Sequence, residues 1–444
     1  LAEQFANVFP ELKAQQDFVA KVILEEENSF LKTLDNGLKR LSLIIDETLV
    51  ANKLKPTLIN GAAAFELLDT FGFPIDLTTL IAAENNLNVD ESEFEEELQK
   101  QKTRSRAASE QDVDDWITLQ DGKSVFVGYD SLEEKAKVLK YRKIKSKGKE
   151  QFQIVLDKTP FYAESGGQVG DVGQLTINNA QLTITDTKKE NDLIVHFTDG
   201  IPADLSGEVV ATVNAIVRKK TTIHHSATHL LQAALQQVLG KHIAQKGSLN
   251  NSEYLRFDFS HFAKMTQEEI VQVENLVNEK IRQNIPVVIK EMAKDDAMKL
   301  GAMALFGEKY GDVVRVVIMD ANYSIELCGG THVGATGELG LFKITSESAV
   351  AAGVRRVEAV CGELALQYTN EAIKQLNNVK DAFKGSKDVL KSIEQLQEEN
   401  AALKKEISTY QNEKVEIVKG QLRTKVTNRN NANVLFEKVE GVNA

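Results

Sequence analysis

Two pairs of metal-binding residue types, about a hundred residues apart, constrain this fold more than any other feature of the chain. The first pair is His225 and His229, and the second is Cys328 and His332 in the string Cys328-Gly-Gly-Thr-His332. Imidazole together with thiolate suits a borderline-soft ion such as zinc. The whole sequence has only seven His and two Cys. We therefore predict that the fold brings both pairs to one zinc ion.

The first pair is predicted to lie on a helix that begins at Thr221 or Thr222 and ends before Gly240. Histidines four residues apart share a helix face. The apolar residues of this helix form a broad face on the opposite side: Ala227, Leu230, Leu231, Ala234, Leu235, Val238 and Leu239. The alternative for such a pair is a solvated polar face, or two histidines hydrogen-bonded within a core. The apolar face and the second pair favour the metal site.

The second pair is predicted to lie in a glycine loop that follows two strands. Val313–Met319 and Ser324–Leu327 are apolar runs separated by a turn. Two glycines after Cys328 let the backbone pass close to an ion. The alternative is a buried cysteine beside a turn, an interpretation that fits Cys361 because no histidine lies near it in sequence.

Length and composition indicate a multidomain, cytoplasmic protein that does not enter a membrane. A chain of 444 residues is too long for one core and predicts three or more domains. No apolar run reaches the length of a membrane span, and two cysteines are too few for a disulfide framework. The net charge of −12 argues against a non-specific nucleic-acid coat but leaves room for a local RNA site. Because the sequence begins with Leu in mid-pattern, we expect a fragment of a longer protein.

The predicted fold class is multidomain α+β, with five successive parts. These are a helical region (1–110), a small β-barrel (111–217), an α/β domain with both ligand pairs (218–362), a helical hairpin or coiled coil (363–425) and the truncated start of another domain (426–444). In the helical region we expect Asp76 to cap one helix and Asp90 with Glu93 to form a capping box for the next.

The barrel is predicted from short alternating runs separated by turn residues: 124–129, 136–141, 152–156, 182–186, 193–197 and 208–217. Among them lies the glycine-rich string Tyr162–Asp171, which is as compatible with tight turns at a barrel rim as with a ligand-facing loop.

The C-terminal part carries a coiled-coil stripe. Its apolar residues recur at alternating spacings of three and four: Ile393, Leu396, Leu403, Ile407, Tyr410 and Ile417. Gly385 divides this stripe from an earlier helix, so an antiparallel hairpin and a homodimeric coil both remain open. Residues 434–441 resemble an opening strand.

Several strings together resemble the alanyl-tRNA synthetase family, over nearly the full length of the chain. They are Phe65–Thr78, Pro160–Gln168, His225-x-x-x-His229, Gln245-Lys-Gly-Ser248, Arg256–His261, Cys328-Gly-Gly-Thr-His332 and Ala352–Glu358. Threonyl-tRNA synthetases share a related domain, but their loop typically carries Pro before the histidine. Free-standing alanyl editing proteins lack the flanking helical regions seen here.

This resemblance implies one part of a two-site enzyme. One site loads alanine onto tRNA(Ala) with ATP and Mg²⁺, and the other is an editing site that hydrolyses tRNA(Ala) mischarged with serine or glycine. We expect this chain to hold the editing site, with zinc bound by His225, His229, Cys328 and His332. The implied partner is tRNA(Ala), through its acceptor stem and aminoacylated 3′ end.

Further residues are assigned roles by chemistry and by resemblance. Thr228, beside the ligand His229, and Gln245 are expected to read the substrate or hold the water, although a helix Thr bonded to backbone and an exposed loop Gln are the ordinary alternatives. With Cys328 they form the expected catalytic set. The expected RNA or substrate contacts are Arg355, Arg356, Arg256 and Ser248, with surface ion pairs as the alternative for the first two. The expected acceptors behind the ligand imidazoles are Asp258 and Glu326.

Two other classes of protein compete with the editing hydrolase. Four protein ligands usually close a structural zinc site, so the chain is alternatively an RNA-binding module with a purely structural zinc ion. A metallopeptidase is disfavoured because Ser226 stands where His-Glu-x-x-His requires Glu.

We recognise no class II synthetase motif in the sequence, and therefore predict that the chain does not activate alanine. An alanine-dependent ATP–pyrophosphate exchange assay on the purified chain is expected to show only background turnover. Exchange that depends on added alanine would contradict this prediction.

Overall fold

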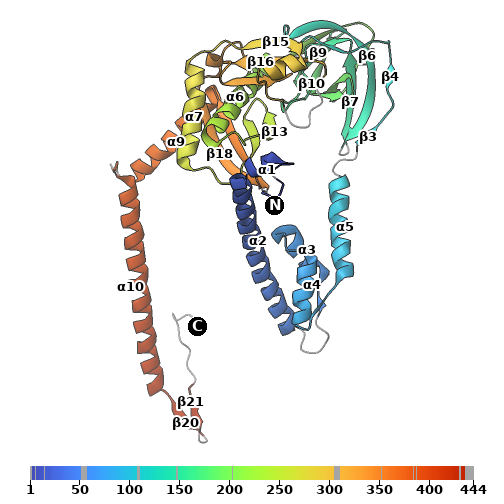
Figure 1. The fold of residues 1–444 in the computed structure, drawn as a ribbon. Helices are drawn as coiled ribbons and strands as arrows, with labels where there is room; N and C mark the ends of the chain where they lie inside the picture. The colour runs from blue at the N-terminus through green and yellow to red at the C-terminus, as the bar shows by residue number, and fades with distance from the viewer. Residues whose placement is uncertain are drawn as a thin grey trace. The chain divides into compact units, whose positions relative to one another are not determined.

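The fold was analysed in a computed structural model. It describes residues 3–5, 7–14, 16–51, 58–107, 111–146, 149–202, 204–304, 311–351, 353–383, 385–386, 388–429 and 432–435. The chain divides into two compact units, Leu1–Leu366 and Gln367–Ala444, whose elements are labelled in Figure 1. The finer domain boundaries expected from the sequence stay predictions.

The first unit begins with a helical region. Its elements are α1 (Pro10–Ala14), α2 (Gln16–Ala51), α3 (Gly61–Phe71), α4 (Ile75–Glu84) and α5 (Glu91–Ala107), with a short parallel pair of strands, β1 (Leu58–Ile59) and β2 (Asn88–Val89). Leu41, Leu67 and Phe73 belong to its buried apolar core. The helical character predicted for this part of the chain is confirmed.

The helix caps agree with the sequence only in part. Gly72 ends α3 in the left-handed conformation, with φ of 60°. Asp90 accepts from the Glu93 backbone N–H at 3.0 Å, but the Glu93 carboxylate accepts from the N–H of Gly61 instead of completing a capping box. The prediction that Asp76 caps a helix is wrong, because α4 begins at Ile75 and Asp76 lies in its first turn.

The predicted β-barrel is confirmed within the described residues. Its sheet contains β3 (Gln111–Val113), β4 (Ile117–Thr118), β6 (Glu133–Ser146), β7 (Lys149–Leu156), β9 (Gly173–Ile177), β10 (Ala180–Glu190), β11 (Leu193–Thr198) and β12 (Glu208–Val213). The barrel order is β12–β9–β10–β11–β7–β6, and β6 pairs back to β12. Closure removes the sheet edges and encloses apolar side chains such as Ile154, Phe161 and Leu175.

Two differences from the predicted strands concern the ends of the barrel segment. The run 124–129 forms only β5 (Val125–Phe126), which pairs in parallel with β8 (Lys158–Thr159). Strand β12 ends at Val213, short of the predicted 217, because Asn214 begins the next helix.

The remainder of the first unit mixes helices and strands, as predicted. Its elements are α6 (Ala215–Leu239), β13 (Gln245–Asn250), β14 (Leu255–Ser260), α7 (Gln267–Arg282), β15 (Val288–Ala293), α8 (Lys294–Lys299), β16 (Val313–Met319), β17 (Ser324–Leu327), the 3₁₀ turn η1 (Thr336–Leu339), β18 (Phe342–Ala351) and β19 (Val354–Cys361). The strands form two antiparallel sheets, β13–β14–β19–β18 and β15–β16–β17. Apolar residues of α6 and α7 share one buried core with β14 and β19.

Helix α6 begins earlier than the sequence suggested. The Asn214 side chain accepts from the backbone N–H groups of Ile216 and Val217, so Asn214 is the N-cap in place of Thr221 or Thr222. The predicted end at Gly240 is confirmed. The added turns carry Arg218, which is buried and forms an ion pair with Asp171 at the barrel. Arg218 is therefore not part of a solvated basic surface.

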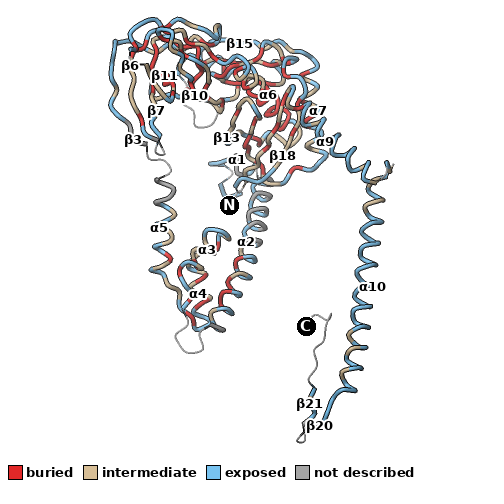
Figure 2. The backbone as a smooth tube through the Cα atoms, turned by 180° about the vertical axis from the view of Figure 1, so that it is seen from behind, coloured by how far each residue is buried: buried red, intermediate tan, exposed pale blue. Residues whose placement is uncertain are grey.

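The second unit consists mainly of helix. It holds most of α9 (Glu363–Ala382), then α10 (Val389–Thr424), β20 (Thr427–Arg429) and β21 (Ala432–Val434). No residue of α10 is buried, as its colour in Figure 2 shows. The predicted stripe is exposed at Leu396, Leu403, Ile407, Tyr410 and Ile417, whereas Ile393 is half-buried. Pairing of these helices stays a prediction. The strand suggested over 434–441 falls largely outside the described residues.

None of the described helices is both long enough and apolar enough to span a bilayer.

One buried histidine lies within the barrel wall. His196 on β11 is fully buried, with Nδ1 3.0 Å from the Ile154 carbonyl and Nε2 2.7 Å from Thr159 Oγ1. Because a carbonyl only accepts, Nδ1 carries the proton and Nε2 accepts from the Thr159 hydroxyl. Burial lowers the pKa of His196 to about 4.

This pKa predicts that acid destabilises the barrel. The unfolded chain takes up the His196 proton below about pH 6.5, whereas the folded barrel takes it up only near pH 4, so stability is lost as the pH falls through this window. The full effect is up to about 3 kcal/mol. Denaturant unfolding between pH 7.5 and pH 5 is expected to show a shallower pH dependence for His196→Gln than for the parent chain. Equal pH dependence would contradict the prediction.

Candidate metal centre

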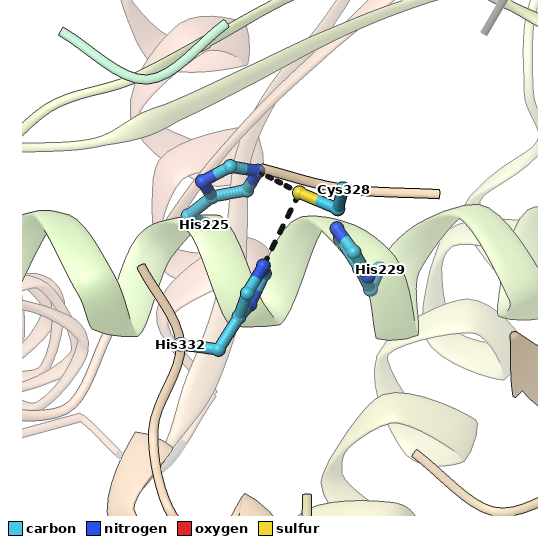
Figure 3. A group of neighbouring side chains, drawn as sticks. All are labelled: His225, His229, Cys328 and His332. Carbon is cyan, nitrogen blue, oxygen red and sulfur yellow. Dashed lines mark hydrogen bonds between the residues drawn. The ribbon is translucent and has the colours of Figure 1, made fainter. Parts of the chain in front are cut away.

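The four residues of the two predicted pairs meet at one point in the fold. Each of His225, His229, Cys328 and His332 offers a ligand atom, and these atoms all lie within 4.8 Å of one another. Cys328 Sγ is 3.4 Å from His225 Nε2 and 3.3 Å from His332 Nε2. Figure 3 shows the three imidazoles around the sulfur, two from α6 and one from the loop. The predicted convergence is thereby confirmed in geometry.

Residues behind two of the imidazoles fix their orientation. His225 Nδ1 donates to Gln168 Oε1 at 2.8 Å, so the unprotonated Nε2 faces Cys328. His332 Nδ1 lies 3.1 Å from the hydroxyl of Ser226, which also accepts from the Val333 backbone N–H. Partners of this kind orient metal-binding histidines and raise their affinity.

The third imidazole has an unsatisfied nitrogen. His229 Nδ1 is buried and has no hydrogen-bond partner among the described residues. The nearest carboxylate oxygen, Glu326 Oε2, lies 3.7 Å away. Burial raises the pKa of Glu326 to about 8. Glu326 thus lies beside a ligand imidazole without accepting a hydrogen bond from it, so its predicted role as an acceptor stays a prediction. The prediction for Asp258 is wrong because Asp258 is bound to Arg356.

Burial keeps the ligand histidines neutral. It lowers the pKa of His225 to about 4 and holds the pKa values of His229 and His332 well below their usual range, with a further contribution from the nearby Arg315 cation. Neutral imidazoles retain the lone pair that a metal requires. Three such nitrogens and one sulfur form a donor set that suits zinc, and the unsatisfied His229 nitrogen fits the same interpretation.

A cavity of about 260 Å³ opens onto this cluster. His225, His229 and Cys328 are in its wall, together with the predicted substrate residues Thr228, Gln245 and Ser248. Tyr162, Ser165 and Gly166 of the glycine-rich string also line it. Of the two interpretations of that string, the ligand-facing loop is therefore the one that the geometry favours.

The polar residues of the cavity have partners of their own. Thr228 Oγ1 lies 2.6 Å from Asn250 Oδ1 and 3.0 Å from the His224 carbonyl, and Gln245 Nε2 donates to Ser248 Oγ at 3.2 Å. The Thr228 hydroxyl keeps acceptor capacity, and the Gln245 carbonyl oxygen is available to a ligand.

The predicted RNA-contacting arginines lie on β14 and β19, away from the cavity wall. Arg355 donates to Glu347 at 2.6 Å, and Arg356 makes two bonds to Asp258. Arg256 Nε is 3.7 Å from Asp258 and has no hydrogen bond among the described residues. The ion pairs favour the surface alternative for Arg355 and Arg356.

Sequence reasoning missed two residues that support the ligands. Gln168 lies in the glycine-rich string, which was singled out for its glycines, and Ser226 was considered only as the residue that excludes a metallopeptidase. The sequence did contain one indication for Ser226, because this residue lies between the two ligand histidines His225 and His229.

Comparison with known families supports the resemblance. A family described as "tRNA synthetases class II (A)" matches residues 1–221, although we recognised no class II motif there, and "Threonyl and Alanyl tRNA synthetase second additional domain" matches residues 314–358. The second match contains Arg315, Glu326 and both residues of the Cys/His pair.

Several individual relatives of this chain are named alanine--tRNA ligase. The chain is 52% identical to an alanine--tRNA ligase of Cytophaga hutchinsonii, 48% to one of Christiangramia forsetii and 45% to one of Porphyromonas gingivalis. Each match covers 99% of this chain and 50% of the relative. The chain therefore spans about half the length of these relatives.

The contact between Gln168 and His225 predicts a loss of metal affinity in Gln168→Ala. Removal of a partner behind a ligand typically weakens metal binding about 10- to 100-fold. Zinc affinity is measured by competition with a chromophoric chelator. Gln153→Ala, which removes another buried barrel glutamine, is the control and should bind zinc as the parent does. Equal affinity in both variants would exclude a supporting role for Gln168.

Proposed function

We propose that this chain, which is homologous over 99% of its length to alanine--tRNA ligases, hydrolyses the ester bond of tRNA(Ala) mischarged with serine or glycine. The proposed reaction is zinc-dependent, with His225, His229, Cys328 and His332 as ligands. Loading of alanine with ATP and Mg²⁺ is not part of the proposed function.

The observation that supports hydrolysis most strongly is the cavity at the ligand cluster. A purely structural zinc site is closed by its four ligands. Here Cys328, His225 and His229 form part of the wall of a space of about 260 Å³, which is large enough for an aminoacyl group. Residues able to hydrogen-bond a ligand stand around the same space.

The chain's own residues bind and orient the ester. Thr228 and Gln245 line the cavity, and in this proposal the hydroxyl of the first and the amide oxygen of the second accept from a substrate ammonium, a serine hydroxyl or a water molecule. Ser248 holds the Gln245 amide and thereby sets its direction. A bound zinc ion would supply positive charge that polarises the ester and lowers the pKa of water.

A separate editing site is useful because a small apolar pocket discriminates poorly between similar amino acids. Such a pocket separates substrates that differ by one small group by only about 1–3 kcal/mol. Glycine enters any pocket that accepts alanine, and serine adds one hydroxyl. A polar cavity that binds this hydroxyl selects serine over alanine.

We also propose the partners that this reaction requires. The substrate is tRNA(Ala), bound through its acceptor stem and aminoacylated end, with the partly exposed side chain of Arg256 on β14 as a phosphate contact. Arg355 and Arg356 would have to exchange their carboxylate partners to bind phosphate. A homodimer through the exposed stripe of α10 (Leu396, Leu403, Ile407) is part of the same proposal.

The second candidate is an RNA-binding module with a structural zinc ion. The observation in its favour is that four protein donors already gather within 4.8 Å, which is the usual number for a structural site.

A deacylation assay with seryl-tRNA(Ala) distinguishes the editing hydrolase from the RNA-binding module. The parent chain is expected to release serine, and Cys328→Ala to lose activity by on the order of 100-fold because one zinc ligand is removed. Cys361→Ala is the matched control, since Cys361 is buried on β19 outside the cluster. Folding of each variant is followed by circular dichroism.

A parent chain that binds zinc, unfolds when a chelator removes it and never cleaves the ester would favour the structural site. Full activity in Cys328→Ala would remove this thiol from the proposed reaction.

A further inference from the structure

An arginine and a tyrosine hold the backbone of the loop that carries Cys328. Arg315 Nη1 donates to the carbonyls of Cys328 and Gly330 at 2.8 and 2.9 Å. The Tyr129 hydroxyl donates to the carbonyl between them, that of Gly329, at 2.5 Å. Three consecutive carbonyls of the ligand loop are thus bound by two side chains.

The two side chains also support each other. The Arg315 guanidinium carbon lies 4.3 Å from the centre of the Tyr129 ring, a distance at which a cation and a ring face attract. The bonds to the loop and the contact with Tyr129 together fix this guanidinium.

The loop gains from such bonds because its two glycines have no side chains with which to hold it. A Cβ at Gly330 would lie 2.0 Å from His225 Cε1, so only glycine fits beside the ligand. At Gly329 a Cβ would meet nothing within 4 Å. Two adjacent glycines lose much conformational freedom on folding, and bonds to their carbonyls offset this loss.

The Tyr129 backbone is itself fixed from the ligand helix. Arg218 on α6 donates to the Gly128 carbonyl at 2.8 Å and to the Pro160 carbonyl at 2.8 Å. Tyr129 follows β5, whereas Arg315 belongs to β16. The contacts to the loop therefore link the segment at the barrel with the sheet that leads into Cys328.

We infer that Arg315 and Tyr129 are positioning residues that set the zinc affinity of the site by holding the carbonyls of residues 328–330. The inference rests on the metal site of the proposed function, but not on which ester the site cleaves. Neither residue offers a zinc ligand in the cluster, and both act through the loop backbone.

The test measures zinc affinity in the full chain by chelator competition. Tyr129→Phe removes one hydroxyl and keeps the ring, and Arg315→Lys keeps the charge but cannot bind two carbonyls in the same way. Both are expected to weaken zinc binding about 10- to 100-fold, the range for residues that orient ligands. In cobalt-substituted protein, the thiolate-to-cobalt absorption band of Cys328 is expected to shift or weaken in both variants.

Two matched controls lie elsewhere in the first unit. Tyr323 also donates to a backbone carbonyl, that of Leu230, and carries Lys280 over its ring. Arg142 also lies over an aromatic ring, that of Trp116. Tyr323→Phe and Arg142→Lys are expected to keep zinc affinity within about twofold of the parent, since neither contacts the loop.

The possible results distinguish a failure of the positioning role from a failure of the metal site itself. If Cys328→Ala loses zinc while Tyr129→Phe and Arg315→Lys bind it as the parent does, the inference is overturned and the metal site stands. If Cys328→Ala binds zinc as the parent does, the metal site itself is wrong. Should Arg315→Lys fail to fold, Tyr129→Phe decides alone. Loss of tRNA binding with unchanged zinc affinity would make Arg315 an RNA contact and overturn the inference.

Discussion

The site depends on imidazoles that are largely withdrawn from water around the half-buried thiol of Cys328. Burial disfavours a charged imidazole, and it keeps His225, His229 and His332 neutral around Cys328. A buried polar group without a partner costs folding free energy. Partners therefore surround two of the histidines, while His229 Nδ1 has none among the described residues.

The residues that hold the zinc ligands in place come from two different cores, that of the barrel and that of α6. The ligands belong to α6 and to the loop after β17, whereas Gln168 belongs to the segment between barrel strands. The ion pair of Arg218 with Asp171 joins α6 to that segment in a buried setting. Breaking one partner of a buried pair costs far more than breaking a surface pair. The ligand helix is thus held in place by the barrel as well as by its own apolar face.

Local patterns predicted the elements better than their ends. The helix of the His225 pair and the strands Val313–Met319 and Ser324–Leu327 agree with the sequence because each has one clear period. The start of α6 was missed because Ala215, Ile216 and Val217 extend the apolar run of the preceding strand, and the basic residues Arg218–Lys220 follow them. Strand β9 was missed although Asn178 and Asn179, both with positive φ, form the hairpin turn to β10.

Contacts between distant segments were beyond a single sequence. Cys328 and the histidines were predicted to meet because their chemistry is specific, and in the fold their ligand atoms lie within 4.8 Å of one another. By contrast, Gln168, Tyr129 and Arg315 are ordinary residues whose roles arise only from their neighbours in space. Asp258 was assigned to an imidazole and instead binds Arg356, because register on β14 and β19 decides which side chains meet.

The distance along the chain between the parts of the site has a consequence for synthesis. Gln168 and Thr331, which are hydrogen-bonded in the fold, are 163 residues apart. A ribosome therefore completes the barrel long before the glycine loop emerges, and the nascent chain has two of the four zinc donors for most of that interval. Firm capture of the ion therefore waits for the last of these segments, so bound zinc marks a polypeptide in which α6 and the loop after β17 have already come together.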